Sequence, residues 1–259
     1  MVAKLNRIGE RNYNTFGSEM IITKYRNAMN IDVYFPEYDW TARNRGYSHF
    51  KKGEIKCPYE PKVYGVGYIG EGKYKSKING KTTRIYDTWC NMLKRCYDSK
   101  QHEKYPTYKN CKVCDEWLCF QNFAEWLESN YYEIEGETMC LDKDILIKHN
   151  KVYSPEACVF VPNIINVLFI KNDKSRGDSV IGTHRLKNGK YVANCHLFNP
   201  ETVKSKNEYL GTYDTQEKAF EIYKYYKEKN IKEVAGYYKE QIPEKLYNGM
   251  YNYIVEITD

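Results

Sequence analysis

The chain has no apolar run of about 18 residues, which is the length that a membrane-spanning helix needs. Its start, MVAKLNRIGERNYNTFGSEM, also lacks the continuous apolar core of a secretory signal. We therefore expect a cytoplasmic protein with no membrane partner. A long internal repeat and a low-complexity tract are absent as well, which argues against a repeat or disordered architecture.

A disulfide framework is not indicated either. The nine cysteines are an odd number in a chain without an export signal. This pattern favours reduced thiols, a metal site or core packing over disulfide bonds.

The composition is that of a folded, basic protein that is rich in tyrosine. Hydrophobic residues make up 42% and charged residues 29%, and 259 residues suffice for two or three compact units. The formal net charge is +6, and 27 tyrosines stand beside nine phenylalanines. Tyrosine and lysine together suit a partner rich in phosphates and bases. An AT-rich genome, whose codons favour Lys, Tyr, Asn and Ile, would produce the same bias, so both explanations stay open.

Residues 1–62 are predicted to form a small β-rich module. The runs Met20 to Tyr25 and Ile31 to Phe35 flank a polar turn and predict a hairpin, and an extended piece around Tyr47 to Ile55 is expected to close a barrel-like sheet. Residues 63–84 are rich in Gly, Pro and Lys and predict a linker with a short hairpin. The basic run in this linker is either a solvated face or a track for phosphates. It consists of Lys73, Lys75, Lys77, Lys81 and Arg84.

Residues 85–175 are predicted to form helices followed by a hairpin and a further helix. The spacing of Trp89, Leu93 and Cys96 indicates one buried helix face. A second helix is expected over CFQNFAEWLESN, with Phe120, Phe123, Ala124 and Leu127 on its buried side. Beyond it, LDKDILI is strand-like, KHNKVYSPEA is a turn-rich loop and CVFV is a second strand. PNIINVLF then begins a helix, with Pro162 suited to its first turn.

This order of motifs resembles the HNH family of His-Me finger nucleases over roughly residues 83–171. WCNMLKRC, VCDEWLCFQNF and LDKDILIKHNKVYSPEACVF correspond to three successive motifs of its phage-encoded branch. The resemblance implies a ββα-metal unit, a phage or prophage origin and the host-cell cytoplasm as the location.

In the active family, an aspartate on the first strand and an Asn or His on the helix hold a divalent metal, and a histidine oriented by a loop asparagine deprotonates the attacking water. The resemblance places Asp142 and Asn166 at the metal positions, for Mg²⁺ or Mn²⁺. It places Lys143 at the position of the catalytic base and Ala157 at that of the orienting asparagine. An unperturbed lysine has a pKa of roughly 10.4, so Lys143 is a poor base at neutral pH.

Several alternatives remain for this hairpin. Lys143 could bind a phosphate as a point charge, which would make the hairpin a DNA grip. His149 is the nearby residue that could restore base function, unless it is merely exposed. Asp142 and Asn166 could also do no more than cap and hydrogen-bond their own hairpin.

A zinc site is a separate possibility. Cys111 and Cys114 have CxxC spacing, and Cys96, His102, Cys140 or Cys158 could supply further ligands. The HNH resemblance matches Cys96, Cys114 and Cys158 to motif cysteines but leaves Cys111 unmatched. Buried packing thiols are the alternative.

Residues 176–259 change period. VIGTHRL, GKYVANCHLF and KNEYLGTY predict three antiparallel strands, followed by a long helix that begins with a capping box of Asp214 and Glu217. The buried stripe of that helix is predicted to contain Ala219, Phe220, Tyr223 and Tyr226. The tail IPEKLYNGMYNYIVEITD is expected to add a short helix.

Residues 180–235, and above all GKYVA and LGTYDTQEKAF, resemble the DNA-binding domain of plant ethylene-response factors, the APETALA-two domain. In that family the sheet lies in the major groove and the helix backs it. Alternation along the second strand assigns Lys190, Val192, Asn194 and His196 to one face and Tyr191, Ala193, Cys195 and Leu197 to the other. The resemblance puts DNA contacts at His184, Asn194, His196 and Tyr209. The family uses mostly Arg and Trp there, so its sequence preference does not carry over, and the face could also be simply solvated.

These observations predict an α+β fold with a β-rich module, a central HNH-like ββα-metal unit and a C-terminal three-stranded sheet with a helix. The expected function is binding of double-stranded DNA, by His184, Lys190, Asn194, His196 and Tyr209 and by Lys73, Lys75 and Lys77, with a degenerate nuclease core. The alternatives are an active metal-dependent endonuclease or nickase and a factor that binds a host defence protein. We expect no organic cofactor, and the oligomeric state is left open.

Overall fold

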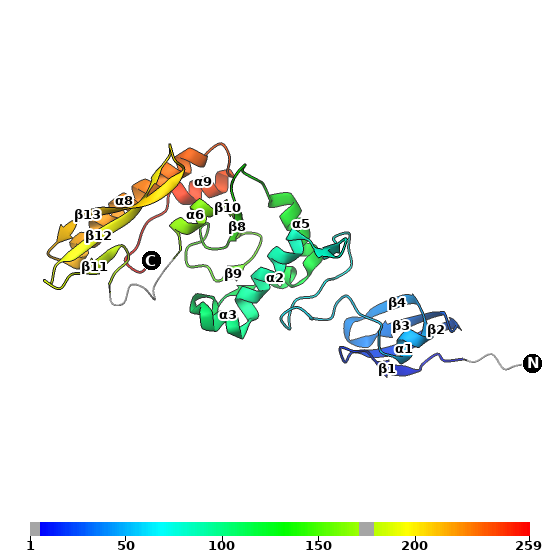
Figure 1. Cartoon of the computed structure of the whole chain (residues 1–259). Helices are drawn as coiled ribbons and strands as arrows, with labels where there is room; N and C mark the ends of the chain where they lie inside the picture. The colour runs from blue at the N-terminus through cyan, green and yellow to red at the C-terminus, as the bar shows by residue number, and fades with distance from the viewer. Residues whose placement is uncertain (1–5, 171–178) are drawn as a thin grey trace, which may run out of the picture. The chain divides into compact units, whose positions relative to one another are not determined.

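The computed structural model describes residues 6–170 and 179–259 (Figure 1). The chain divides into two compact units, residues 1–129 and 130–259. Both contain helices and small sheets, so the predicted α+β class is confirmed. The predicted boundaries at residues 62 and 84 lie inside the first unit and stay predictions, and that at residue 175 lies outside the described residues. None of the helices in the described part is long and apolar enough to cross a membrane.

The first unit begins with a four-stranded antiparallel sheet in chain order. Its strands are β1 (Arg11–Tyr13), β2 (Glu19–Asn27), β3 (Asn30–Phe35) and β4 (Trp40–Arg45), with the 3₁₀ turn η1 (Pro36–Tyr38) between the last two. The predicted hairpin is confirmed as β2 and β3. The extended piece predicted around residues 47–55 is wrong, because helix α1 (Tyr47–Lys51) begins there. Gly46 caps this helix, and the buried Phe50 stacks on Tyr47, so the segment closes the core as a helix.

The rest of the first unit is mainly helical. It contains the hairpin β5 (Lys77–Ile78) and β6 (Lys81–Thr82), α2 (Arg84–Tyr97), α3 (Ser99–Lys104), η2 (Pro106–Tyr108), β7 (Lys112–Val113), α4 (Asp115–Leu118) and α5 (Phe120–Asn130). Both predicted helix faces are confirmed, since Trp89, Leu93 and Cys96 in α2 are buried, as are all four predicted residues of α5. The indole N–H of Trp89 in α2 donates to the carbonyl of Trp117 in α4 at 2.7 Å and connects these two helices.

The predicted linker is in part a packed segment. A Cβ on Gly67 would lie 2.4 Å from a methyl of Leu93, so only glycine allows this approach. The backbone of Tyr68 bonds Leu118 and Phe120 at 2.9 Å each. The stretch therefore forms part of the helical core of the first unit.

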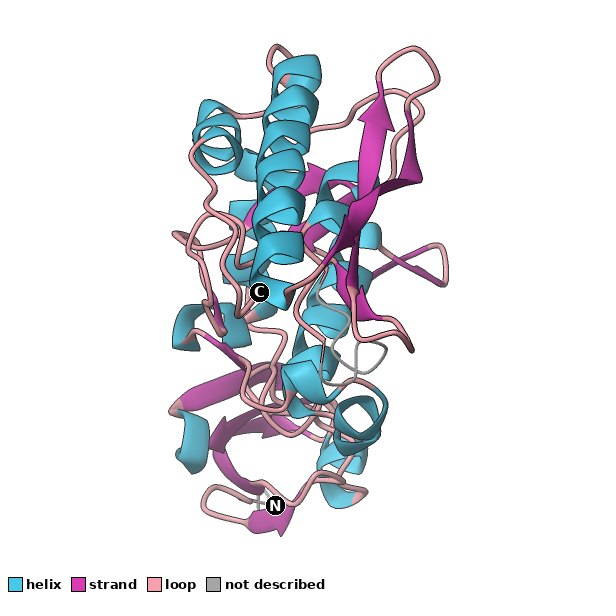
Figure 2. Cartoon of the chain, turned by 90° about the vertical axis from the view of Figure 1, so that its left-hand side faces the viewer, coloured by secondary structure: helices cyan, strands magenta, loops and turns pink. Residues whose placement is uncertain are grey.

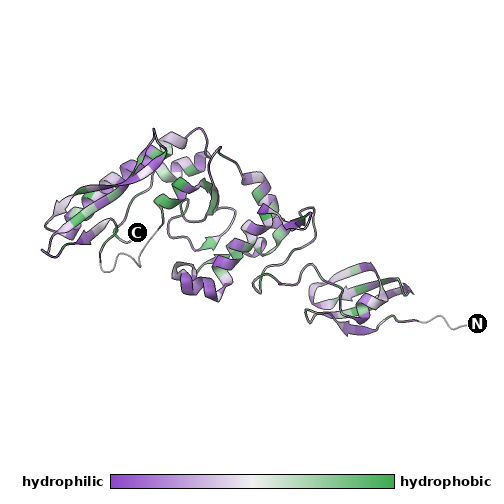
Figure 3. Cartoon of the chain, viewed as in Figure 1, coloured by the Kyte–Doolittle hydropathy of each residue, from purple (hydrophilic) through white to green (hydrophobic). Residues whose placement is uncertain are grey.

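The second unit begins with a ββα arrangement. Strands β8 (Met139–Asp142) and β10 (Val159–Pro162) pair antiparallel, and α6 (Asn163–Leu168) follows directly and packs on both. The short β9 (Val152–Tyr153) lies in the loop between them. Figure 3 shows how hydrophobic this hairpin and helix are. The predicted strand LDKDILI ends early, at Asp142, because the side chain of that residue turns the chain.

The unit ends with a sheet backed by a long helix, as predicted. Strands β11 (Thr183–Arg185), β12 (Tyr191–Asn199) and β13 (Lys204–Tyr213) are antiparallel, and α8 (Gln216–Tyr238) covers one face of the sheet (Figure 2). Helix α9 (Glu244–Tyr251) packs against α8. In the predicted buried stripe, Ala219 and Tyr223 are buried, while Phe220 and Tyr226 are half-buried.

The predicted capping box is wrong by one residue. Thr215 is the N-cap of α8, and its hydroxyl accepts the N–H of Lys218 at 3.2 Å. Asp214 lies one residue earlier and instead pairs with Lys190. Sequence spacing alone did not separate the two capping residues, because both types cap helices well.

Candidate functional site

Asp142 ends strand β8 and organises the turn that follows. One of its carboxylate oxygens accepts the backbone N–H groups of Asp144 at 2.9 Å and Ile145 at 2.8 Å. The residue is 9% exposed. This is the local side-chain-to-backbone bonding that aspartate uses to break a strand, so half of the carboxylate is committed to the fold.

The electrostatics of Asp142 oppose its charged form. Burial, with the nearby carboxylate of Asp144, raises the pKa of Asp142 to about 6 from 3.8. The two backbone N–H groups and Lys143 act in the opposite direction without cancelling the effect. Ionisation of Asp142 is therefore unfavourable within this turn compared with a carboxyl in water.

Lys143 is buried and its ammonium is engaged. Nζ donates to a carboxylate oxygen of Asp144 at 2.9 Å and to the carbonyl of Asn150 at 3.1 Å, and it lies 5.8 Å from the ring centre of Tyr153. The residue is 7% exposed. An ammonium that donates hydrogen bonds to two oxygens has no lone pair for a water proton. This geometry supports neither a general base nor an open phosphate contact at Lys143.

Asn150, which the sequence reasoning did not single out, ties the loop to the strand end. Its side-chain amide donates to the carbonyls of Lys143 at 2.7 Å and Val152 at 2.6 Å, and its oxygen accepts the N–H of Val152. An asparagine within a turn-rich loop was the available signal.

His149 lies on the surface of the same loop, with φ at +63°. Its Nε2 is 3.3 Å from a carboxylate oxygen of Glu256. Glu256 and Asp259 complete the one group of three metal-type ligand atoms found among residues 6–170 and 179–259. The ammonium of Lys148 already pairs with both carboxylates, at 3.1 and 2.9 Å. A cation is thus built into this group, which does not fit a metal site.

The other two positions that the HNH resemblance marks are Asn166 and Ala157. Asn166 is half-buried on α6, which packs against β8 and β10. Ala157 is buried and offers no hydrogen-bonding side chain to orient a base. One half-committed, buried carboxylate and one amide do not fit the oxygen-rich shell that Mg²⁺ or Mn²⁺ requires.

The candidate zinc ligands are mostly interior side chains. Cys96 and Cys111 are buried and Cys114 is half-buried, all in the first unit, and the three do not form a metal-type group within the described part of that unit. Cys158 is buried in the second unit. These positions favour packing thiols over a zinc knuckle.

The exposed face of the C-terminal sheet gathers the predicted DNA-contacting residues. Asn194 of β12 lies opposite Tyr209 of β13, and its amide nitrogen is 3.4 Å from Nδ1 of His184 on β11. His196 lies two residues along β12 and is exposed, as is Tyr209 at 65%. All three strands thus contribute polar groups to one surface. Register places Asn207 and Thr212 on it too, and the hydroxyl of Tyr209 bonds that of Thr212 at 2.8 Å.

The opposite face is apolar and covered by α8. Ala193 and Cys195 are buried against the helix, as alternation predicts. Two details depart from simple alternation. Val192 is buried although assigned to the open face, because it lies in the central strand between His184 and Thr212. Phe198 is also buried, and its ring packs edge-on against Tyr237 of α8.

The C-terminal sheet and its loops carry more positive than negative charge. Residues 179–213 contain five basic and two acidic side chains: Arg185, Lys187, Lys190, Lys204, Lys206, Glu201 and Glu208. Lys190 pairs with Asp214 at 2.9 Å and Lys206 with Glu208 at 3.0 Å. These exposed pairs are worth little and can exchange for phosphates.

The predicted lysines of the first unit differ in their surroundings. Lys73 is paired with Glu128 at 2.8 Å, which raises its pKa, and its ammonium lies over the ring of Tyr74. Lys75 and Lys77 are exposed on and beside the β5–β6 hairpin.

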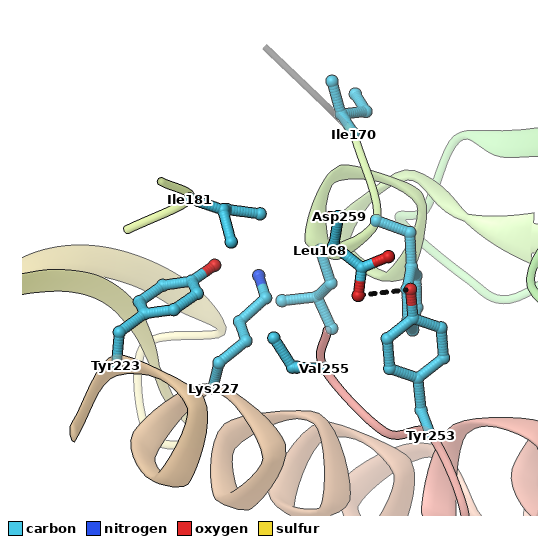
Figure 4. A pocket seen from close by; sticks show the side chains of 9 residues that line it. Leu168, Ile170, Ile181, Tyr223, Lys227, Tyr253, Val255 and Asp259 are labelled. Atoms are coloured by element: carbon cyan, nitrogen blue, oxygen red, sulfur yellow. Dashed lines mark hydrogen bonds between the residues drawn. The ribbon is translucent and has the colours of Figure 1, made fainter. Parts of the chain in front are cut away.

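A small pocket in the second unit contains a lysine that the sequence reasoning missed. Figure 4 shows Lys227 of α8 directed between apolar side chains that include Leu168 and Ile181. The space in this pocket is about 20 Å³, enough for about one water molecule. Burial lowers the pKa of Lys227. The spacing of apolar residues in α8 predicted that Tyr223 is buried. It did not predict that Lys227, one helical turn later, lines the same pocket as Tyr223.

Comparison of this chain with protein families, with curated proteins and with solved structures gives no match.

Proposed function

We propose that this protein binds double-stranded DNA through the open face of its C-terminal sheet and that its HNH-like hairpin is a degenerate nuclease core. The motif resemblances further suggest a phage or prophage origin. The observation that carries the proposal is the polar surface shared by His184, Asn194, His196 and Tyr209, on the side of the sheet opposite α8.

The chemistry of this surface suits base edges. An asparagine amide can pair with adenine through two hydrogen bonds in the major groove, and histidine and tyrosine add donors and acceptors. The exposed lysines around the sheet provide the sequence-independent attraction to phosphates. The rigid helix behind the sheet keeps the strands in register, so the reading groups need little ordering on binding.

The geometry of the hairpin argues against catalysis. Lys143 stands at the position of the family's base, and its ammonium is already bonded to Asp144 and Asn150. One carboxylate oxygen of Asp142 already accepts two backbone N–H groups of the turn that follows it. The endonuclease alternative would need a base and a metal shell from other groups.

Fluorescence anisotropy with a labelled mixed-sequence duplex tests the proposal. We expect the protein to bind the duplex, and the logarithm of its association constant should fall linearly with the logarithm of the salt concentration. Asn194→Ala and Tyr209→Ala should each weaken binding by about tenfold, as expected for base-contacting side chains. Tyr225→Ala is a matched control, because Tyr225 on α8 is 62% exposed, close to the 65% of Tyr209, and lies on the helix behind the sheet.

Two results would count against the proposal. Failure to bind duplex DNA at low salt would leave the alternative of a factor that binds a host protein. Equal losses of affinity in Tyr209→Ala and Tyr225→Ala would show that the sheet face is not the contact surface.

A further inference from the structure

The β5–β6 hairpin of the first unit has a two-residue turn of defined geometry. Lys77 pairs with Thr82 and Ile78 with Lys81, and Asn79 and Gly80 form the turn with φ of 51° and 78°. Two successive positive φ values are those of a type I′ turn, whose twist suits a two-stranded ribbon. All four strand residues are exposed, so neither face of the ribbon is covered by the rest of the unit.

The base of the hairpin is held firmly. The buried Gln121 bonds the backbone N–H and carbonyl of Tyr74 at 3.0 Å each. On the other side, Thr83 donates its N–H to Ser76 and its hydroxyl to Lys75, both at 3.0 Å, and caps helix α2. A two-stranded ribbon is marginal by itself. These anchors fix its direction relative to the helices of the unit.

The charge on the hairpin has one sign. The sequence contains five basic and no acidic residues between Glu71 and Asp87. Lys75, Lys77 and Lys81 are exposed, and within the described part of the chain they take part in no salt bridge. Such a cluster is complementary to a polyanion.

Ile78 gives the cluster a second property. It is 57% exposed and adjoins the turn, with Lys77 before it and Lys81 opposite it across the ribbon. A partner complementary to the tip of this hairpin must present an apolar slot for Ile78 and anionic groups beside it for the lysines. The phosphates and stacked bases of duplex DNA provide both, and an isoleucine is among the side chains that wedge between base steps in the minor groove.

We propose that the β5–β6 hairpin enters the minor groove of duplex DNA, places Ile78 against a base step and sets its lysines on the flanking phosphates, and thereby bends the duplex. This inference rests on the proposed binding of DNA. It adds a second contact, in the first unit, that deforms the DNA rather than reading its sequence.

A duplex of about 30 base pairs, the size of a typical bendable site, carrying a donor and an acceptor dye at its ends tests the inference. Binding of the full chain should bring the ends closer and raise the energy transfer. Ile78→Ala should weaken binding by about tenfold and lose most of the added energy transfer, because it removes most of the wedge. Ile78→Phe should keep the bend. Met29→Ala is the matched control, since Met29 is 80% exposed in the turn between β2 and β3.

The outcomes separate the two proposals. If the unaltered chain does not bind the duplex, the proposed function fails. If it binds but Ile78→Ala changes neither affinity nor energy transfer while tryptophan emission shows a folded first unit, the wedge fails and the proposed function stands. If polyglutamate competes as well as DNA of equal charge, the hairpin recognises an acidic polypeptide and the inference is overturned.

Discussion

Replacement of Asp142 by asparagine tests whether this residue is a structural turn or a metal ligand. The substitution keeps the side-chain oxygen that accepts the N–H groups of Asp144 and Ile145. It removes a charge from a side chain that is 9% exposed. A turn residue should therefore tolerate the change, whereas a metal ligand should not.

The magnitude follows from the raised pKa. The Asp142 carboxyl titrates at about 6 in the folded chain against 3.8 ordinarily, so between these values the folded chain binds more protons than the unfolded chain. The contribution of the Asp142 carboxyl to the free energy of unfolding thus falls as the pH rises from about 4 to 6 and stays constant at higher pH. The full difference corresponds to about 3 kcal/mol. We expect Asp142→Asn to raise the free energy of unfolding of the second unit by about 2 kcal/mol at pH 7.5 and to change it little at pH 4.

The two units can be followed separately during thermal unfolding. All four tryptophans, Trp40, Trp89, Trp117 and Trp126, lie in the first unit. Calorimetry records both units, so the transition that tryptophan emission does not follow belongs to the second. Asp142→Asn should raise its midpoint by several degrees at pH 7.5, while Asp142→Ala, which orphans two N–H groups, should lower it. Destabilisation by Asp142→Asn, together with a stabilisation by Mg²⁺ that the variant loses, would show that Asp142 is a metal ligand.

Three further substitutions or reactions probe the sheet and the helix behind it. Gly182→Ala should destabilise the second unit by at least about 2 kcal/mol in a thermal melt, because φ is +72° and a Cβ would lie 2.0 Å from the ring of Tyr223. Asn230→Ala should lower the free energy of unfolding by about 1 to 3 kcal/mol, because the N–H of Phe198 donates to the buried Asn230 oxygen at 2.6 Å. The same change should speed hydrogen exchange at the N–H of Phe198. Burial raises the pKa of Cys195 to about 11, so iodoacetamide at pH 8 should label it only after unfolding, and rapid labelling of the native chain would contradict this burial.

Periodicity in the sequence predicted the elements whose buried residues lie close together along the chain. The face of α2, the face of α5, the hairpin of β2 and β3 and the three C-terminal strands each follow a regular spacing, and each was found. Tertiary contacts decided the exceptions. The segment at residues 47–51 became a helix because Phe50 fills the core of the first sheet, which no local pattern announced.

The sequence named the residues of the candidate site but did not predict how they contact one another. The motif order pointed to Asp142 and Lys143, yet sequence alone left Lys143 open as a base or a phosphate grip. Only the structure gives its bonds to Asp144 and Asn150. The register of the C-terminal sheet likewise brings His184 beside Asn194, ten residues apart in the chain. Exposure of Ile78 at a hairpin tip depends on what the rest of the unit leaves uncovered, which spacing does not encode.

Incubation of the protein with supercoiled plasmid and Mg²⁺ or Mn²⁺, with Asp142→Ala alongside and both read on one gel, tests the central claim most directly. We expect a mobility shift that weakens as salt rises, without nicking, in both proteins. Nicking that Asp142→Ala abolishes would show that the hairpin is a working metal-dependent nuclease and not a degenerate one.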